Sequence, residues 1–319
     1  MIKKILIGSR KPFVKDLLFA EGITRSGKFL LANILSAFNG IEPAQSCRML
    51  EMIPVFTKFG FIDKKTAGEL LRCDIDIHCY EMYIGRNLNH RSSDKSSVFN
   101  HPRCTEFLKR CLMPDGDKAL NRFYKEKPYS LFVMHETMPN IEIYFDLFPK
   151  LKIIHMKRSP MDLVFSLYKR GGGRRLNKDP RYWMIPFEEE KKFFPWYVYP
   201  HQKKYFKLSE MDRVALRVIN LFKLYESKLA TLSEKHRKKI LTVSFESLML
   251  KPKKEIVRIS SFLGKKPSSQ MPRILRREGL PDKSFFDSED EKISVIKKLT
   301  SPEHFRVLLK LQEEYKKHA

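Results

Sequence analysis

Short apolar segments alternate with longer segments of helical periodicity along most of the chain. Runs with few charges are typical of buried strands, and they lie at 16–22, 130–134, 151–156 and 239–245. Apolar residues repeat every three or four positions in the predicted helices, which are 29–38, 63–85, 141–148, 160–168, 211–235 and 252–263. This alternation predicts an α/β fold of three layers, with a central parallel sheet covered by helices on both faces.

Two long stretches lack this periodicity. Residues 86–103 are polar and irregular, and residues 171–204 combine three glycines and four prolines with many aromatic residues, so both are expected to be loops. Residues 287–318 predict two charged helices. Because neither an internal repeat nor a linker divides the chain, we expect a single domain over residues 1–319.

The charge of the chain is strongly positive, with 62 Lys and Arg against 37 Asp and Glu and a formal net charge of +25. An excess of this size indicates an anionic partner, which could be nucleic acid, an acidic glycan, a membrane surface or a phosphorylated small molecule. Composition alone does not choose among these four. An apolar content of 42% over 319 residues excludes disorder of the whole chain.

Cysteine content and hydropathy indicate where the protein works. Five cysteines are too few for a disulfide framework, and their odd number favours reduced thiols in the cytoplasm. No run of eighteen apolar residues is present, so we expect a soluble, cytoplasmic protein without a membrane span. Cys73, His78 and Cys79 lack the paired spacing of a zinc site, and we therefore expect no metal.

The first predicted strand leads into the loop Gly22-Ile-Thr-Arg-Ser-Gly-Lys-Phe29, which matches the phosphate-binding pattern G-x-x-x-x-G-K. Gly27 permits a backbone whose successive N–H groups converge on one phosphate, and the following helix directs its positive end at the same anion. Arg25 and Lys28 add charge. Phe29 replaces the hydroxyl that would hold Mg²⁺, so the loop suits a phosphate better than Mg·ATP. A basic turn without a ligand is the alternative interpretation.

A second basic loop follows a later predicted strand. Ser159 and Pro160 indicate the N-cap and the first position of a helix, and Asp162 is placed to close a capping box. Arg158 ends the strand and Ser166 lies two helical turns beyond Ser159, so that a guanidinium fork and a hydroxyl can bind one phosphate. From its spacing alone, this segment is better explained as a solvated basic turn.

Taken together, the two loops resemble the family of PAPS-dependent sulfotransferases, where PAPS is 3′-phosphoadenosine-5′-phosphosulfate. In that family a loop of the type R-S-G-T-T wraps the 5′-phosphosulfate, and a segment R-[DN]-P-x-D-x-x-x-S binds the 3′-phosphate through its Arg and Ser. Arg158, Pro160, Asp162 and Ser166 match the second pattern.

Two further segments extend the resemblance. Residues 148–154 are similar to the lead-in F-P-x-A-K-F-I, and residues 241–264 are similar to the family's late strand, Y-E-D-L segment and F-L-G helix end. The four matches cover residues 16–264 in the family's order. The resemblance therefore implies a sulfotransferase fold similar to that of P-loop NTPases, with PAPS as the donor.

Carried over position by position, the resemblance also implies donor-binding residues. They are Arg25, Ser26, Gly27, Lys28, Phe29, Arg158, Ser166, Arg276 and Arg277. Lys28 and Phe29 replace two threonines of the family, so the 5′-phosphate would depend on backbone N–H groups, Ser26, Arg25 and Lys28. Arg276 and Arg277 follow the F-L-G segment, where the family has a basic loop that closes over the 3′-phosphate.

Sulfuryl transfer needs a base for the acceptor's proton and a cation to balance charge on the bridging oxygen. Arg25 and Lys28 are the candidate cations. His135 resembles the base of the family's K-T-H-L-P segment, although an ordinary histidine at a strand end fits the sequence equally well. Its neighbour Glu136 should face the opposite way. Glu42, which follows the first predicted helix, is the alternative base.

The expected activity is transfer of a sulfuryl group from PAPS to a hydroxyl or amine of a glycan, lipid or small molecule, with neither a metal nor nucleic acid as partner. Residues 86–103 and the aromatic residues of 171–204 are candidates for lining the acceptor cleft. Two alternatives stay open. A P-loop kinase would use residues 22–28 but needs a hydroxyl at Phe29, and a nucleic-acid-binding protein would explain the charge but has no recognised motif.

Overall fold

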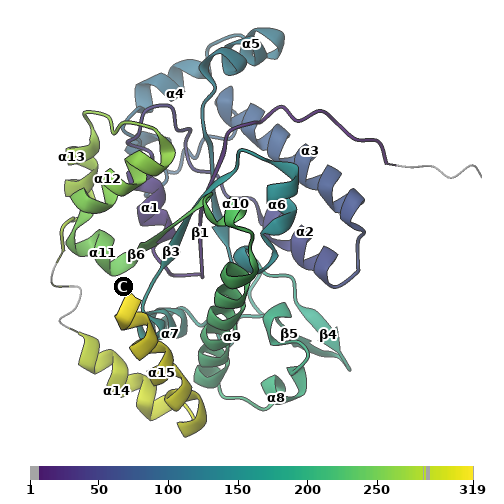
Figure 1. Ribbon diagram of the computed structural model, residues 1–319, viewed down its shortest axis with the longest axis vertical. Coiled ribbons are helices and arrows are strands. Elements are labelled where there is room, and N and C mark those ends of the chain that lie inside the picture. The colour runs from purple at the N-terminus through teal and green to yellow at the C-terminus, as the bar shows by residue number, and fades with distance from the viewer. Residues whose placement is uncertain (1–6, 283, 285–287, 319) are drawn as a thin grey trace, which may run out of the picture.

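The computed structural model describes residues 7–282, 284 and 288–318. At its centre lies a sheet of four parallel strands in the order β2-β1-β3-β6 (Figure 1). The strands are β1 (Leu17–Gly22), β2 (Ser130–His135), β3 (Lys152–Lys157) and β6 (Ile240–Ser244). In register, Gly22 pairs with His135 and Glu21 with His155, so the ends of three strands lie side by side. The predicted parallel α/β sheet is thereby confirmed.

Alternate residues of each strand supply two separate cores. Leu17 and Phe19 belong to one apolar cluster, and Leu18 and Ala20 belong to the other. The first core is covered by α2 (Arg48–Lys58), α3 (Lys64–Tyr83), α6 (Glu142–Leu147), α7 (Pro160–Lys169) and α9 (Glu210–Thr231). The second is covered by α1 (Lys28–Leu35), α11 (Phe245–Leu250), α12 (Pro252–Leu263) and α13 (Met271–Arg277). The molecule therefore has the three layers that the sequence predicts.

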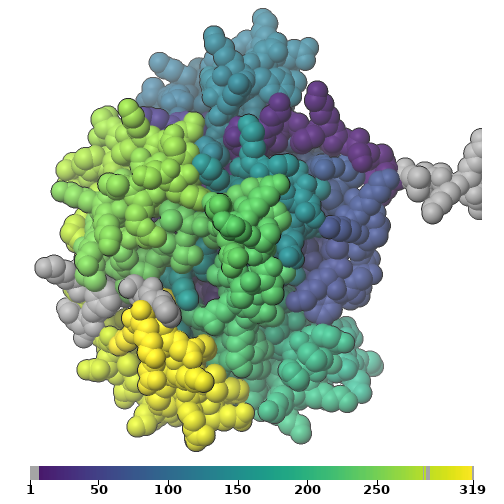
Figure 2. Space-filling view, in the orientation of Figure 1, coloured from purple at the N-terminus to yellow at the C-terminus, as the bar shows by residue number. Residues whose placement is uncertain are grey.

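The two charged helices predicted near the carboxyl end are present as α14 (Glu289–Leu299) and α15 (Pro302–His318). They pack against α7 and α9, with Ile296 and Leu308 fully buried, and they cover the end of α9 in the space-filling view (Figure 2). On α15, Gln312 accepts a hydrogen bond of 2.8 Å from the Ser159 hydroxyl. The last helix therefore supports the loop that follows β3.

Several short elements are not predicted from the sequence. Besides α2, α11 and α13, they are α4 (Cys104–Arg110), α5 (Gly116–Glu126), α8 (Gln202–Phe206), α10 (Glu234–Arg237), β4 (Phe187–Glu189), β5 (Lys192–Phe194) and the 3₁₀ helices Val98–Asn100, Met138–Asn140 and Trp196–Val198. Most of these helices span only one or two turns, and the two strands have three residues each. Such elements contain too few residues to show a periodic pattern in the sequence. The helix predicted at 211–235 is interrupted because Leu232 is extended and Ser233 caps α10.

The arrangement leaves the carboxyl ends of β1, β2 and β3 facing one edge, where the loops after β1 and β3 begin α1 and α7. In open parallel sheets this edge is where ligands bind. Within the described residues, no helix combines the length and the apolar character needed to cross a bilayer.

Candidate active site

The loop between β1 and α1 has the shape of an anion cradle. Arg25 and Gly27 adopt positive φ angles of 77° and 100°. A Cβ atom on Gly27 would lie 2.3 Å from the Phe245 ring, so only glycine fits there. No described side chain caps the amino end of α1. The N–H groups of its first turn therefore point toward the loop with the positive end of the helix dipole.

Lys28 folds back under this loop rather than into solvent. Its side chain is buried, and Nζ donates a hydrogen bond of 2.9 Å to the Ile23 carbonyl. Burial lowers the pKa of Lys28 to about 8, although the charges of Glu21, Glu136 and Glu51 act in the opposite direction. The ammonium group is thus a buried cation held at the start of α1.

The second basic loop meets the first one directly. Arg25 Nε donates to the Ser166 hydroxyl at 2.9 Å, and Arg158 donates to the Arg25 carbonyl at 2.8 Å. The Arg158 guanidinium also lies 4.4 Å from the centre of the Phe245 ring. Burial lowers the pKa of both arginines, and for Arg25 the charge of Arg170 lowers it further. Residues 141 positions apart therefore form one cationic cluster with a hydroxyl.

The start of α7 follows the prediction in part. The Ser159 hydroxyl accepts a hydrogen bond from the Asp162 N–H, which confirms the N-cap. The predicted capping box is wrong. The Ser159 N–H donates to Glu246 instead, and the Asp162 carboxylate pairs with Lys292 at 2.9 Å. Helices α11 and α14 supply these partners, which a local sequence pattern cannot anticipate.

His135 ends β2 and is held by a carboxylate that the sequence analysis missed. Glu51 Oε1 on α2 accepts hydrogen bonds from the His135 backbone N–H at 2.7 Å and from ring Nδ1 at 2.6 Å. In the tautomer in which Nδ1 donates to Glu51, Nε2 keeps a lone pair. Burial lowers the pKa of His135 well below its usual value and raises that of Glu51 to about 8. The only signal for Glu51 is an acid on the apolar face of α2.

The histidine ring contacts two aromatic rings from different parts of the chain. Its centre is 6.0 Å from that of Phe29 on α1 and 5.6 Å from that of Trp183 in the 171–204 stretch. Glu136 pairs with the buried Arg217 of α9 and also accepts a hydrogen bond of 3.0 Å from the Thr24 hydroxyl of the loop after β1. The structure thus brings His135 next to the loop that carries Arg25 and Lys28.

Glu42 lies elsewhere. Its backbone N–H bonds to the Tyr129 carbonyl, just before β2, whereas His135 ends the same strand. Its carboxylate forms a two-point ion pair with Arg110, at 2.5 and 3.2 Å. Burial raises the pKa of Glu42, with Arg110 acting in the opposite direction. The structure does not bring Glu42 together with His135.

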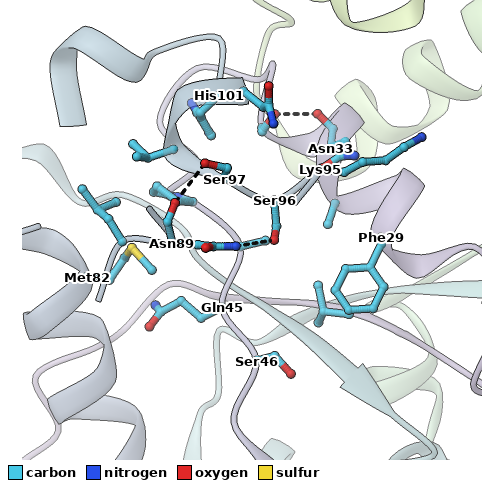
Figure 3. Close-up of a pocket in the computed structure, with 18 of the residues that line it drawn as sticks. Phe29, Asn33, Gln45, Ser46, Met82, Asn89, Lys95, Ser96, Ser97 and His101 are labelled. Atoms are coloured by element: carbon cyan, nitrogen blue, oxygen red, sulfur yellow. Dashed lines mark hydrogen bonds between the residues drawn. The ribbon is translucent and has the colours of Figure 1, made fainter. Parts of the chain in front are cut away.

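Beside Phe29 opens a pocket of about 390 Å³ (Figure 3). Amides and hydroxyls of the 86–103 stretch line one wall, and the Asn89 side chain donates to Ser96 at 3.0 Å. Arg277 also lines it and donates to the Asn100 carbonyl. Arg276, on the same helix α13, is exposed. Lys95, His78 and Arg277 are basic groups in the lining, and no Asp or Glu lines the pocket among the described residues.

A group with metal-ligand chemistry also lies near this pocket. Ligand atoms of Cys47, Asp74 and His78 lie within 4.8 Å of one another. The His78 Nδ1 is 2.9 Å from the Asp74 carbonyl oxygen, and hydrogen bonding to Asp74 raises the pKa of His78 to about 11. An imidazolium with that pKa is charged at neutral pH, which disfavours metal binding. The sequence analysis considered Cys73 and Cys79 beside His78 and missed Cys47 and Asp74, because Cys47 is distant in sequence.

The sequence matches a family of known proteins. The family model described as "Sulfotransferase domain" matches residues 17–295. None of the curated proteins compared matches the sequence significantly. The chain is similar to the solved sulfotransferase domain of the Synechococcus PCC 7002 olefin synthase, at 16% identity and a TM-score of 0.46, over 97% of this chain and 98% of that one. It is also similar to a sulfotransferase from Alicyclobacillus acidocaldarius, at 14% identity and a TM-score of 0.40, over 94% and 96% of the two chains.

The family match spans the whole sheet, both basic loops and His135, and it ends within α14. It therefore covers every element that builds the site described above. On this match, the chain belongs to the sulfotransferase family.

Proposed function

We propose that this sulfotransferase uses PAPS as its donor and transfers the sulfuryl group to a hydroxyl or amine of a glycan, lipid or small molecule. The observation that carries the proposal is the cluster of Arg25, Arg158 and Ser166 above the anion cradle of α1. PAPS has two anionic ends, a 5′-phosphosulfate and a 3′-phosphate. A cradle and a separate arginine–hydroxyl pair, joined through Arg25, suit such a molecule.

The residues of the loop fit the donor in a further respect. The Ser26 hydroxyl is buried and has no hydrogen-bond partner among the described residues. An unpaired buried hydroxyl is unfavourable unless a ligand or water satisfies it. The Ser26 hydroxyl therefore supports binding of an anionic oxygen group at this loop.

In this proposal the backbone of residues 26–29 and the Lys28 ammonium hold the 5′ end of PAPS. Arg158 and Ser166 hold its 3′-phosphate, whereas Arg277 lines the pocket beside Phe29 and donates to the Asn100 carbonyl. When bound, PAPS supplies a sulfur atom already activated by its bond to phosphate. The positive charges of Arg25 and Lys28 then stabilise the negative charge that develops on the bridging oxygen as the sulfuryl group leaves it.

For the base, we propose His135. The acceptor's O–H or N–H proton moves to His135 Nε2, and Glu51 keeps the ring in the tautomer whose Nε2 can accept it. The low pKa of His135 means that the ring is neutral at neutral pH, so that Nε2 is not already protonated in the tautomer set by Glu51. The ion pair of Glu42 with Arg110 favours His135 over Glu42 for this role.

Titration calorimetry without Mg²⁺ tests the proposal. We expect the protein to bind 3′,5′-ADP more tightly than 5′-AMP, because only the former carries the 3′-phosphate. A kinase would instead bind ATP with Mg²⁺ most tightly and ignore a 3′-phosphate. A nucleic-acid-binding protein would bind oligonucleotides with a steep salt dependence and neither mononucleotide. Equal affinities for 3′,5′-ADP and 5′-AMP would contradict the proposal.

A further inference from the structure

A second pocket, of about 250 Å³, lies on the other side of the loop that follows β1. Its walls come from that loop, the end of α7, the segment after α7 and helix α9. Among the described residues, no Asp or Glu lines it, whereas five arginines do. They are Arg25, Arg170, Arg175, Arg181 and Arg217. Such a concentration of one charge sign indicates an anionic ligand.

The segment after α7 is folded so that it presents these arginines. Three glycines, residues 171–173, follow the end of α7. A Cβ atom on Gly173 would lie 2.2 Å from the Glu210 carbonyl oxygen, so the chain passes directly over the start of α9. Beyond this crossing, the Asp179 carboxylate accepts from Arg175 Nε at 2.8 Å and from Arg181 Nε at 3.0 Å. One carboxylate therefore holds two guanidinium groups at the pocket.

The inner wall is equally fixed. Arg217 is only 2% exposed and pairs with Glu136. It also donates to the Tyr182 hydroxyl at 3.0 Å and to the Thr24 hydroxyl at 3.1 Å. A buried guanidinium thus ties the aromatic rim of the pocket to the loop after β1.

The charges in this pocket are not balanced. The carboxylates paired with its arginines are Glu136 and Asp179, so five guanidinium groups face two carboxylates and three positive charges remain in excess. Neither Arg25 nor Arg170 has a carboxylate partner within the part of the chain that the structure describes. Burial lowers the pKa of Arg25, and repulsion from Arg170 lowers it further. An anion bound between them would relieve that repulsion.

The pocket adjoins the proposed base but is distinct from the proposed 3′-phosphate site. Trp183 lines it and also contacts the His135 ring. Arg158 and Ser166 are not among the described residues that line it, and Arg25 separates them from it. A molecule held here therefore lies on the side from which an acceptor would approach His135.

We propose that this arginine pocket binds an anionic oxygen group of the acceptor, such as a phosphate, sulfate or carboxylate. The acceptor is then a molecule that already carries negative charge, and its hydroxyl or amine lies at His135. This inference rests on the proposed function. Guanidinium forks bind oxygen anions at two points, and the rings of Tyr182 and Trp183 offer flat surfaces to the rest of the molecule.

The test uses phenyl phosphate as the probe and phenol as its neutral counterpart. Both are titrated into the full chain saturated with 3′,5′-ADP, so that the donor site is filled. We expect phenyl phosphate to bind and phenol not to bind. Arg170→Ala and Arg181→Ala should each lower the affinity for phenyl phosphate roughly ten- to hundredfold. Arg174→Ala is the matched control, because Arg174 lies in the same segment, pairs with Glu210 and lines a different pocket.

Tryptophan fluorescence locates the probe. The chain has two tryptophans, and Trp196 is buried in the core, so a change on binding should come from Trp183 and disappear in Trp183→Phe. Equal binding of phenol and phenyl phosphate, or an equal loss in Arg174→Ala, would overturn the inference. So would a loss of 3′,5′-ADP affinity in Arg170→Ala as large as the loss for the probe, because the pocket would then belong to the donor.

Failure of the proposed function gives a different result. Phenyl phosphate is also titrated without nucleotide, so the affinity of the pocket is measured in either case. Absence of a preference for 3′,5′-ADP over 5′-AMP in the unmodified protein would contradict the proposed function. A preference for 3′,5′-ADP without any binding of phenyl phosphate would overturn only the assignment of the arginine pocket.

Discussion

Replacing Arg158 with alanine should remove most of the protein's discrimination between 3′,5′-ADP and 5′-AMP. Arg158 donates to the Arg25 carbonyl and lies over the Phe245 ring, so its guanidinium is held at the loop after β1 before any ligand arrives. A charge-assisted hydrogen bond to a partly desolvated phosphate contributes about 1.5–3 kcal/mol. Since about 1.4 kcal/mol corresponds to a tenfold change, the affinity for 3′,5′-ADP should fall roughly ten- to hundredfold.

Titration calorimetry of both nucleotides, without Mg²⁺, measures this change. The affinity for 5′-AMP should hardly differ between the variant and the unmodified protein, because 5′-AMP lacks the group that Arg158 binds. Arg237→Ala is a suitable control, since it removes the same charge from an exposed position on α10, which precedes β6. If Arg158→Ala weakens both nucleotides equally, Arg158 supports the fold of the loops and does not recognise the 3′-phosphate.

The remaining predictions concern the base, the buried cation and the cradle. His135→Ala should reduce turnover roughly a hundredfold or more while 3′,5′-ADP still binds; activity that survives there and is lost in Glu42→Gln would move the base to Glu42. Lys28→Met should lower turnover more than 3′,5′-ADP affinity, and unchanged turnover would remove Lys28 from the reaction. Folding lowers the pKa of Lys28 from 10.5 to about 8. Burying the charged ammonium therefore destabilises the folded state fully below pH 8, and this cost disappears above pH 10.5, where Lys28 is neutral in both states. Urea unfolding should therefore show the stability of the unmodified protein rising relative to Lys28→Met by about 3 kcal/mol across that range, and a constant difference would contradict the shift. Gly27→Ala should destabilise the fold in the same assay, since its Cβ would overlap Phe245 at a positive φ, and unchanged stability would refute that contact.

The sequence by itself determined the layers of the molecule and the contents of both basic loops. Buried strands such as 130–135 consist of apolar runs, and helices such as 252–263 carry their own start and stop signals, Pro252 and Gly264. These are local properties of the backbone and of side-chain periodicity. The pattern therefore predicted an α/β sheet with helices on both faces, and the order of the motifs indicated the family.

Only the tertiary structure decided which of these residues meet. The bond from Arg25 to Ser166 joins positions 141 apart, and the partner of His135 is Glu51, which lies 84 positions earlier. The predicted capping box failed for the same reason, because distant helices supplied other partners for Ser159 and Asp162. Ion pairs and hydrogen bonds between distant segments depend on how the helices pack on the sheet. A local pattern contains no information about that packing. The contacts between distant residues of the site, and the arginine pocket, therefore appear only in the folded chain.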